Sequence, residues 1–303
     1  MTKFRLALDW TPNVNHIGFF VAQQKGFYQA HGLEVEILDP AADDYQLTPA
    51  KKVELGHAEF ALCPMESVIS YRTKSTTFDM IAIAAILQYD LSAIAVRADE
   101  SVQSPKDLDG KSYASYQARY EDEIVKQMIR NDGGKGEIEL IYPKKLGIWD
   151  TVIEGTYDAT WIFLNWEGVA AEASKVALRY FKMRDYHIPY SYSPVLSAQE
   201  SAVAQNREHY QAFLEATKAG YLYCQQYAEE AVAILQTFVP ESDRHIDLSL
   251  ALARTVDAFG DETSWGKLDA DNVSTFLQWL SQHGLNQHPL KVEELIWMPA
   301  HQS

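Results

Sequence analysis

Cysteine and long apolar stretches are both scarce in this sequence. Only Cys63 and Cys224 occur among 303 residues, far apart and without the spacing of metal ligands, so neither a disulfide framework nor a zinc site is expected. No stretch approaches the roughly 18 apolar residues of a membrane span, and the most apolar short run, residues 80–87, is only as long as a strand. The sequence therefore predicts a reduced, soluble protein with no membrane insertion.

Basic residues are also few. Lys and Arg number 26 against 42 Asp and Glu, which gives a formal net charge of -16, so a basic surface for nucleic acid or an anionic membrane is not expected. The N-terminal segment MTKFRLALDW lacks the apolar core and the small-residue cleavage site of a secretory signal. We expect a cytoplasmic location for the sequence as it stands, or a periplasmic one if a leader peptide was removed.

Strands and helices alternate along the N-terminal part of the chain. Alternating apolar residues predict a strand over 4–8, and after a break at 10–13, Asn15 can cap a helix that carries Ile17 and Phe20 on one face. Further along, the pattern predicts a short helix ending at Gly32, a strand over 33–37, a helix from Pro49 to Gly56, and a strand over 60–62.

The same order of elements returns in residues 147–169, where a helix, a glycine and a strand follow one another. A chain of this length suggests about two domains, and alternating strands and helices favour α/β halves with mainly parallel sheets. Residues 88–91 and the Pro-containing segment IPYSYSPV are predicted to be crossovers between the halves. We expect one lobe from 1–91 and 192–303, including a helical C-terminal part, and a second lobe from 92–191.

The break between the first strand and the first helix contains the first candidate ligand-binding residues. Ligands of open α/β sheets sit beyond the carboxyl ends of the strands, so Trp10 could stack on a planar ligand while Asn13 and His16 bond its edges. The alternative is structural, because Pro12 and Asn13 are an ordinary turn pair and a single His near a helix start is commonly structural.

Two further loops present polar residues at the same end of their strands. Glu66 and Ser67 begin a helix, where Glu66 could meet a ligand or only support the first turn. Tyr116 could cover one face of a ring, and Arg119 could grip a carboxylate or phosphate. Alternatively, Arg119 pairs with a neighbouring acidic residue within 121–123.

Aromatic residues complete the candidate ligand-binding set. The segment WIFLNWEG supplies Trp161 and Trp166, and Tyr192 lies in the second crossover. Trp161 alternates with Ile162 along a strand, so one of the two side chains is expected to face the core and the other the space between the lobes. Stacking rings beside carboxylates suit a flat heterocycle that carries hydrogen-bond donors, such as an aminopyrimidine.

Several segments of the sequence resemble a known superfamily. LDWTPNVNHIGFFVAQQKGFY, GHAEFAL, DLDGKSYASY and GTYDATWI are similar to periplasmic binding proteins, in the branch that holds sulfonate-binding proteins, thiamine-pyrimidine-precursor binding proteins and the fungal thiamine-pyrimidine synthases. PMESVISY and IPYSYSPV resemble a poorly characterised bacterial and fungal subgroup. The resemblance implies a two-lobed, type II-like periplasmic-binding-protein fold, with two doubly wound α/β lobes and a two-strand hinge near residues 88–92 and 190–195.

The resemblance also implies a function. We expect a protein that closes on a small heteroaromatic ligand similar to a thiamine-pyrimidine precursor. One role open to such a protein is that of the solute-binding component of an ABC transporter, with a permease as its partner. The alternatives are a cytosolic enzyme of thiamine-pyrimidine biosynthesis and a sulfonate-type binder. The synthase resemblance implies pyridoxal phosphate on a Lys, a His and a Cys cluster, but those positions fall here on Cys63, Ser67 and IPYSYSPV. We therefore expect no enzyme activity, no cofactor and no metal.

Overall fold

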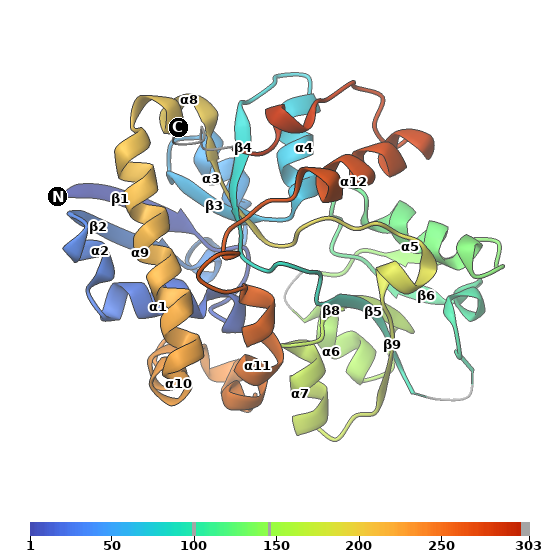
Figure 1. Ribbon diagram of the computed structural model, residues 1–303. Coiled ribbons are helices and arrows are strands. Elements are labelled where there is room, and N and C mark those ends of the chain that lie inside the picture. The colour runs from blue at the N-terminus through green and yellow to red at the C-terminus, as the bar shows by residue number, and fades with distance from the viewer. Residues whose placement is uncertain (99–100, 145–146, 298–303) are drawn as a thin grey trace.

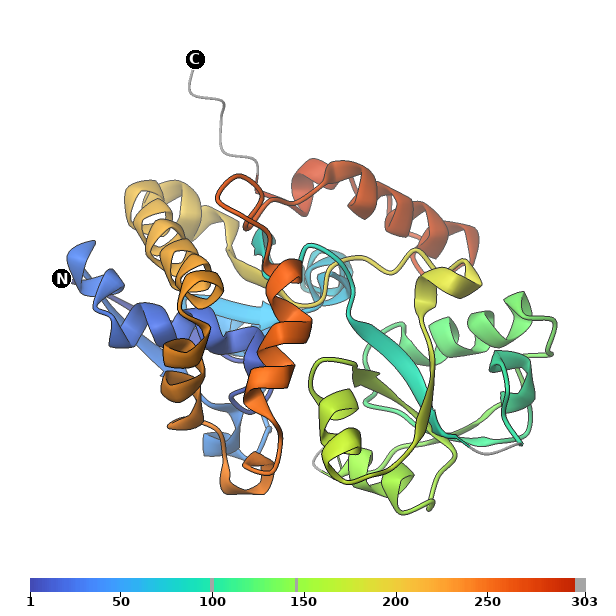
Figure 2. The same ribbon diagram turned by 60° about the horizontal axis from the view of Figure 1, so that its bottom comes forward.

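The chain builds two five-stranded sheets, each covered by helices (Figures 1 and 2). The computed structural model describes residues 1–98, 101–144 and 147–297. The first sheet has the strand order β2-β1-β3-β10-β4, and the second has the order β7-β6-β8-β5-β9. We call the first sheet with its helices lobe 1 and the second sheet with its helices lobe 2. The strands of lobe 1 are β1 Thr2–Ala7, β2 Leu33–Leu38, β3 Phe60–Cys63, β4 Met80–Ala85 and β10 Val195–Gln199.

The strands of lobe 2 are shorter on average and lie within one continuous stretch of the chain. They are β5 Ser92–Arg97, β6 Ser112–Ala114, β7 Glu139–Ile141, β8 Ala159–Phe163 and β9 Leu178–Phe181. Both sheets are mixed, because β10 is antiparallel to β3 and β4, and β5 is antiparallel to β8 and β9. The expectation of mainly parallel sheets was therefore too simple. The two antiparallel strands are the ones that directly follow a crossover between the lobes, so each enters its sheet from the opposite lobe.

Helices of lobe 1 come from both ends of the chain. They are α1 Ile17–Gln24, α2 Phe27–Ala30, α3 Pro49–Glu54, α4 Met65–Thr73, α8 Glu200–Gln205, α9 Arg207–Gln226, α10 Ala228–Gln236 and α11 Leu248–Thr255. Lobe 2 has α5 Glu121–Asn131, α6 Ile148–Ile153 and α7 Glu167–Ala173, and the last long helix is α12 Ala270–Gln282. The predicted early strands and helices, the helix and strand after residue 147, and the helical C-terminal part are confirmed. Of the described helices, none has both the length and the apolar character needed to cross a bilayer.

Aromatic stacking and close helix contact hold lobe 1 together. Phe60 of β3 stacks on Phe213 of α9 with ring centroids 3.9 Å apart, and both side chains are fully buried. Helix α9 lies against α1 so closely that a Cβ atom placed on Gly220 would stand 2.0 Å from the carbonyl oxygen of Gly18. Burial of each large apolar side chain contributes about 1.5–3 kcal/mol, so this contact fixes the C-terminal helices on the N-terminal sheet.

Helix α12 links lobe 1 to lobe 2. The chain on each side of it is attached to strand β4 of lobe 1, since Gly266 bridges Ala85 and Ile296 bridges Ala82. From the middle of the helix, Phe276 contacts the Tyr120 ring of lobe 2 at 6.5 Å between centroids. In Figure 2 the helix crosses the molecule above the crossover segments.

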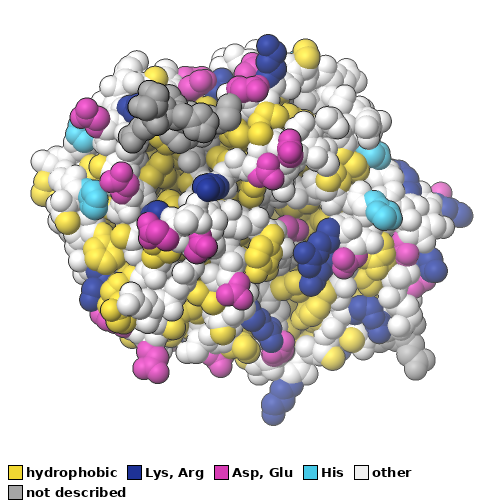
Figure 3. Space-filling view, in the orientation of Figure 1, with side chains coloured by type: hydrophobic (Ala, Val, Ile, Leu, Met, Phe, Trp, Pro, Cys, Tyr) yellow, Lys and Arg dark blue, Asp and Glu magenta, His cyan; other side chains and the backbone are white. Residues whose placement is uncertain are grey.

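Charged side chains are distributed over the molecular surface. On the face shown in Figure 3, acidic and basic side chains are interspersed, with hydrophobic side chains between them. The larger exposed apolar side chains of the described residues are Met1, Leu55, Tyr89, Tyr142 and Tyr227. They lie on different segments of the chain and do not form a single docking surface.

Candidate functional site between the lobes

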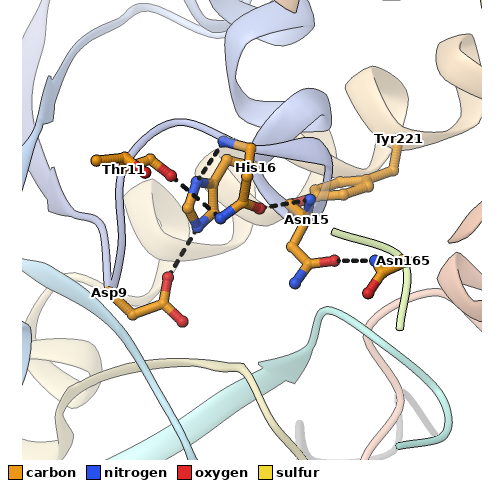
Figure 4. Close-up of polar contacts among 7 residues, drawn as sticks. Asp9, Thr11, Asn15, His16, Asn165 and Tyr221 are labelled. Atoms are coloured by element: carbon orange, nitrogen blue, oxygen red, sulfur yellow. Dashed lines mark hydrogen bonds and ion pairs between the residues drawn. The ribbon is translucent and has the colours of Figure 1, made fainter. Parts of the chain in front are cut away.

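The loop from β1 to α1 is held by its own side chains. Asn13 caps the short 3-10 turn Val14–His16, because its Oδ1 accepts the Asn15 N–H at 2.9 Å. The fully buried His16 ring accepts the Asn13 N–H at Nδ1, 3.3 Å away, and its Nε2 lies 2.8 Å from Asp9 Oδ1 (Figure 4). The expected cap at Asn15 is wrong, since Asn13 is the capping side chain. Asn13 and His16 thus shape the loop, and direct contact of either with a ligand stays a prediction.

Asn15 instead reaches across to lobe 2. Its Oδ1 accepts a hydrogen bond of 2.8 Å from Asn165 Nδ2 (Figure 4). The same Nδ2 donates to Thr255 Oγ1 at 2.8 Å. The backbone oxygen of Asn15 accepts the Tyr221 hydroxyl at 2.6 Å. Asn165 is buried and its Oδ1 has no partner among the described residues. This buried polar junction therefore joins the loop after β8 to lobe 1.

An aromatic group forms the next contact between the lobes. The Trp10 ring of lobe 1 meets the Tyr116 ring of lobe 2 edge-on, with centroids 5.9 Å apart and planes at 83°. The Tyr45 ring also packs against the Trp10 ring, with the two ring centroids 5.1 Å apart. Trp10, Tyr45 and Tyr116 are each partly exposed. The structure thus brings together the two predicted stacking residues, and adds Tyr45, which sequence reasoning missed.

Glu66 lies in the first turn of α4 and is almost completely buried between the lobes. Its carboxylate accepts the backbone N–H of Tyr120 at 3.3 Å and the Tyr190 hydroxyl at 3.2 Å. Burial, followed by repulsion from Glu121, raises the pKa of Glu66 to about 7. A carboxyl group that is easily protonated near neutral pH therefore stands where the two lobes meet.

Arg119 closes the same interface from the lobe 2 side. Its guanidinium donates to the hydroxyls of Ser70 at 2.7 Å and Thr73 at 2.9 Å, both on α4 of lobe 1, and lies 5.1 Å from the Tyr120 ring centre. The alternative pairing with an acidic residue in 121–123 is not observed. Arg119 thus acts as a contact between the lobes in this conformation, and its contact with a ligand stays a prediction.

Trp161 faces outward from β8, whereas its neighbour Ile162 is buried, as their alternation predicts. The Trp161 ring contacts the Tyr190 ring at 5.0 Å, and Tyr190 in turn contacts Phe276 of α12 at 5.7 Å. Tyr190 therefore joins Glu66, Trp161 and α12 in one cluster. Sequence reasoning placed Tyr190 only in the crossover, because nothing in its neighbourhood indicates which side chains surround it.

Three other predicted residues have different surroundings. Trp166 is buried and packs with apolar residues of lobe 1. Tyr192 is buried, and its hydroxyl accepts the Asp269 N–H at 3.0 Å in front of α12. Ser67 is half-buried in the first turn of α4 beside Glu66. Trp166 and Tyr192 thus contribute to packing in this conformation, and contact of Ser67, Trp166 or Tyr192 with a ligand stays a prediction.

Two more glutamates lie at helix starts of lobe 2. Glu121 accepts the Tyr113 hydroxyl at 2.8 Å and the N–H groups of Tyr116 and Ala118 at 3.1 Å each, and burial raises its pKa. Glu167 accepts the Phe163 N–H at 2.9 Å, and burial raises its pKa to about 7. Burial raises the pKa of Tyr116, and the charges of Glu167 and Glu121 raise it further, so both glutamates lie near this ring.

The cofactor of the synthases does not fit the residues present. Cys63, at the position expected for the Lys, is buried on β3 with its thiol 3.3 Å from Ser197 Oγ, and burial raises its pKa to about 12. A thiol cannot form the imine that a Lys forms with an aldehyde. No group of three or more His, Cys, Asp or Glu side chains suited to a metal occurs within residues 1–98, 101–144 and 147–297.

The two lobes and their shared interface define the class as the periplasmic-binding-protein fold. The alkanesulfonate-binding protein SsuA from Xanthomonas axonopodis pv. citri, solved with MOPS, superposes with a TM-score of 0.73 at 11% identity over 98% of both chains. The ligand-binding component of an ABC-type import system from Staphylococcus aureus gives a TM-score of 0.71 at 14% identity, over 98% of this chain and 97% of that one. These likenesses confirm the predicted fold.

The family is more specific than the fold. The family model described as NMT1/THI5 like matches residues 13–231, and the chain belongs to this family. It is 26% identical to the formylaminopyrimidine-binding protein of Halalkalibacterium halodurans, over 95% of this chain and 87% of that protein. It is 24% identical to a putative thiamine biosynthesis protein of Haemophilus influenzae, over 96% and 90%. A 4-amino-5-hydroxymethyl-2-methylpyrimidine phosphate synthase of Legionella pneumophila is 25% identical over 79% and 75%.

Proposed function

We propose that this protein binds a small heteroaromatic molecule of the aminopyrimidine class between its two lobes. The observation that carries the proposal is the meeting of Trp10 and Tyr116 across the interface, with ring centroids 5.9 Å apart. The buried Glu66 lies at the same interface, where it accepts the N–H of Tyr120. In the conformation described here the rings touch one another. Separation of the lobes by bending at the two crossovers would admit a planar ligand between the rings, which would replace their mutual contact with stacking on the ligand.

The polar groups beside the rings suit the edge of an aminopyrimidine. An ionised carboxylate accepts two parallel hydrogen bonds, as an amidine-like edge would donate them. Glu66 has such a carboxylate, and its present partners, the Tyr120 N–H and the Tyr190 hydroxyl, lie at 3.3 and 3.2 Å. Since these are long hydrogen bonds, a ligand could replace them at small loss.

The relatives support the same ligand class. One relative is by name a formylaminopyrimidine-binding protein, and a neighbour in structure is the ligand-binding component of an ABC-type import system. We extend the proposal to an ABC permease as partner, which would receive the ligand when the lobes open.

A binding function is favoured over the synthase activity named for another relative. At the position expected for the cofactor-binding Lys, this chain has the buried Cys63, and the segment IPYSYSPV contains no cysteine. We therefore expect the protein to release its ligand without chemical change.

Titration calorimetry with formylaminopyrimidine and with 4-amino-5-hydroxymethyl-2-methylpyrimidine tests the proposal, with mass spectrometry of the recovered compound. Trp10→Ala should weaken binding about tenfold or more, because stacking of a heteroaromatic ring on an aromatic side chain contributes about 1–3 kcal/mol. Trp297→Ala, in a partly buried tryptophan that packs on the lobe 1 core, is the control and should retain affinity. Absence of binding to the wild-type protein, or recovery of a converted compound, would refute the proposal.

A further inference from the structure

Three helices begin at the interface between the lobes, and each has a glutamate in its first turn. Helix α4 follows β3 and contains Glu66, α5 follows β6 and contains Glu121, and α7 follows β8 and contains Glu167. The N-terminus of a helix attracts anions, because its first N–H groups have no partner within the helix and its dipole is positive there. In this protein the chain's own carboxylates stand at these positions.

The carboxylates also occupy backbone donors that an anionic ligand would use. Glu121 accepts the N–H groups of Tyr116 and Ala118 in the loop before α5, at 3.1 Å each. Glu167 accepts the N–H of Phe163 at 2.9 Å, and Glu66 accepts the N–H of Tyr120 from the opposite lobe at 3.3 Å. A phosphate or sulfonate would have to displace a carboxylate that cannot move far from its own helix.

The cationic side chains at the interface are engaged as well. Arg119 donates to the Ser70 and Thr73 hydroxyls, and Arg254 of α11 donates to both carboxylate oxygens of Glu172 in α7 at 2.9 Å. Both arginines therefore already have partners in this conformation.

From this arrangement we infer that the site selects an uncharged or cationic ligand and rejects phosphates and sulfonates. The inference rests on the proposed function and narrows its ligand class. An ammonium group on the heterocycle would form a charge-assisted hydrogen bond to Glu66, whose present hydrogen bonds from the Tyr120 N–H and the Tyr190 hydroxyl are long. Glu66 has a pKa raised to about 7, so the approach of a cation would favour its ionised form.

A series of compounds that differ only in charge tests this inference. The ring of 4-amino-2-methylpyrimidine is used with a 5-aminomethyl group (cationic), a 5-hydroxymethyl group (neutral) and a 5-hydroxymethyl phosphate (anionic), together with an alkanesulfonate. Calorimetry at pH 7 should show binding of the first two and at least about 100-fold weaker binding of both anions, because the backbone N–H groups that an anion would use already donate to Glu66, Glu121 and Glu167.

The variant Glu66→Gln tests whether the charge of Glu66 causes this selectivity. The variant keeps the size of the side chain and an acceptor oxygen, and should bind the aminomethyl compound about tenfold more weakly while changing the affinity for the neutral compound less. Glu34→Gln removes the same charge from an exposed position on β2, where Glu34 pairs with Lys3, and should leave the affinities unchanged.

The outcomes separate this inference from the proposed function. Phosphate or sulfonate binding as tight as that of the neutral compound would overturn the inference and leave the binding function standing. Loss of discrimination in both Glu66→Gln and Glu34→Gln would overturn the role given to Glu66. Failure of every pyrimidine to bind the wild-type protein would refute the proposed function itself, and this inference with it.

Discussion

Replacement of Glu66 by glutamine should change how stability depends on pH. The carboxyl group is 4% exposed, and its pKa is raised from 4.5 to about 7, first by burial and then by Glu121. Between these two pH values the folded protein holds a proton on Glu66 that the unfolded chain has released. The free energy of unfolding should therefore decrease as pH rises from about 4.5 to 7, and the loss should be complete above about 7.

The magnitude follows from the same numbers. A pKa of about 7 in place of 4.5 corresponds to about 3 kcal/mol of unfavourable free energy for the ionised form in the folded protein. Glu66→Gln carries no charge at any pH and keeps an oxygen to accept the Tyr190 hydroxyl. At pH 8 the ligand-free variant should therefore be more stable than wild type by up to about 3 kcal/mol, whereas at pH 4 the two should be nearly equal.

Urea unfolding of both proteins, followed by tryptophan fluorescence at several pH values from 4 to 8, measures this difference. The Glu34→Gln variant again serves as the control, because Glu34 is exposed and should not alter the pH profile. Parallel profiles for wild type and Glu66→Gln would show that Glu66 is not protonated in the folded protein. The physical picture of a buried, destabilising carboxyl group would then be wrong. A gain in stability combined with weaker binding of a cation would identify Glu66 as a residue that favours function over stability.

Two further predictions concern packing and buried polar contacts. Gly220→Ala should destabilise the protein by at least about 1–3 kcal/mol, because the new Cβ would stand 2.0 Å from the Gly18 carbonyl oxygen. Gly168→Ala is the control and should be tolerated, because its Cβ would meet nothing nearer than 3.7 Å. Equal melting temperatures for the two variants would contradict the close contact at Gly220. Asn165→Ala should lower the free energy of unfolding by about 1–3 kcal/mol, because it leaves the buried side-chain oxygens of Asn15 and Thr255 without their donor. A change below about 0.5 kcal/mol in chemical denaturation would show that water replaces the amide.

The sequence predicts this fold well where local signals suffice. Strict alternation over 33–37, Gly32 and Gly56 after helices, and the helical period after Arg207 all depend on neighbouring residues, and each predicted element is present. The antiparallel entry of β5 and β10 was not predicted, because it depends on the path of the crossovers between lobes. The residues of a strand do not by themselves determine which other strand it pairs with.

At the candidate site, too, some features follow from local sequence and others depend on tertiary packing. The contact of Trp10 with Tyr116 agrees with the rule that ligand-binding loops follow the carboxyl ends of strands, because each residue follows such a strand end in the sheet of its own lobe. Tyr45 and Tyr190 were missed because no strand end marks them, and they reach the interface only through packing of distant segments. His16 is buried within its loop and Trp166 among apolar residues of lobe 1, and contact of either with a ligand stays a prediction. Side-chain direction at these positions is a tertiary property.

Helix α12 has a mechanical consequence for opening. Two crossover strands alone would let lobe 2 both tilt and twist about their axis. The helix is fixed to β4 at both of its flanks, while Phe276 rests on Tyr120 of lobe 2 and on Tyr190 of the second crossover, which adds a third connection between the lobes. Rotation of lobe 2 must therefore slide these rings along one another or separate them, so the helix resists opening.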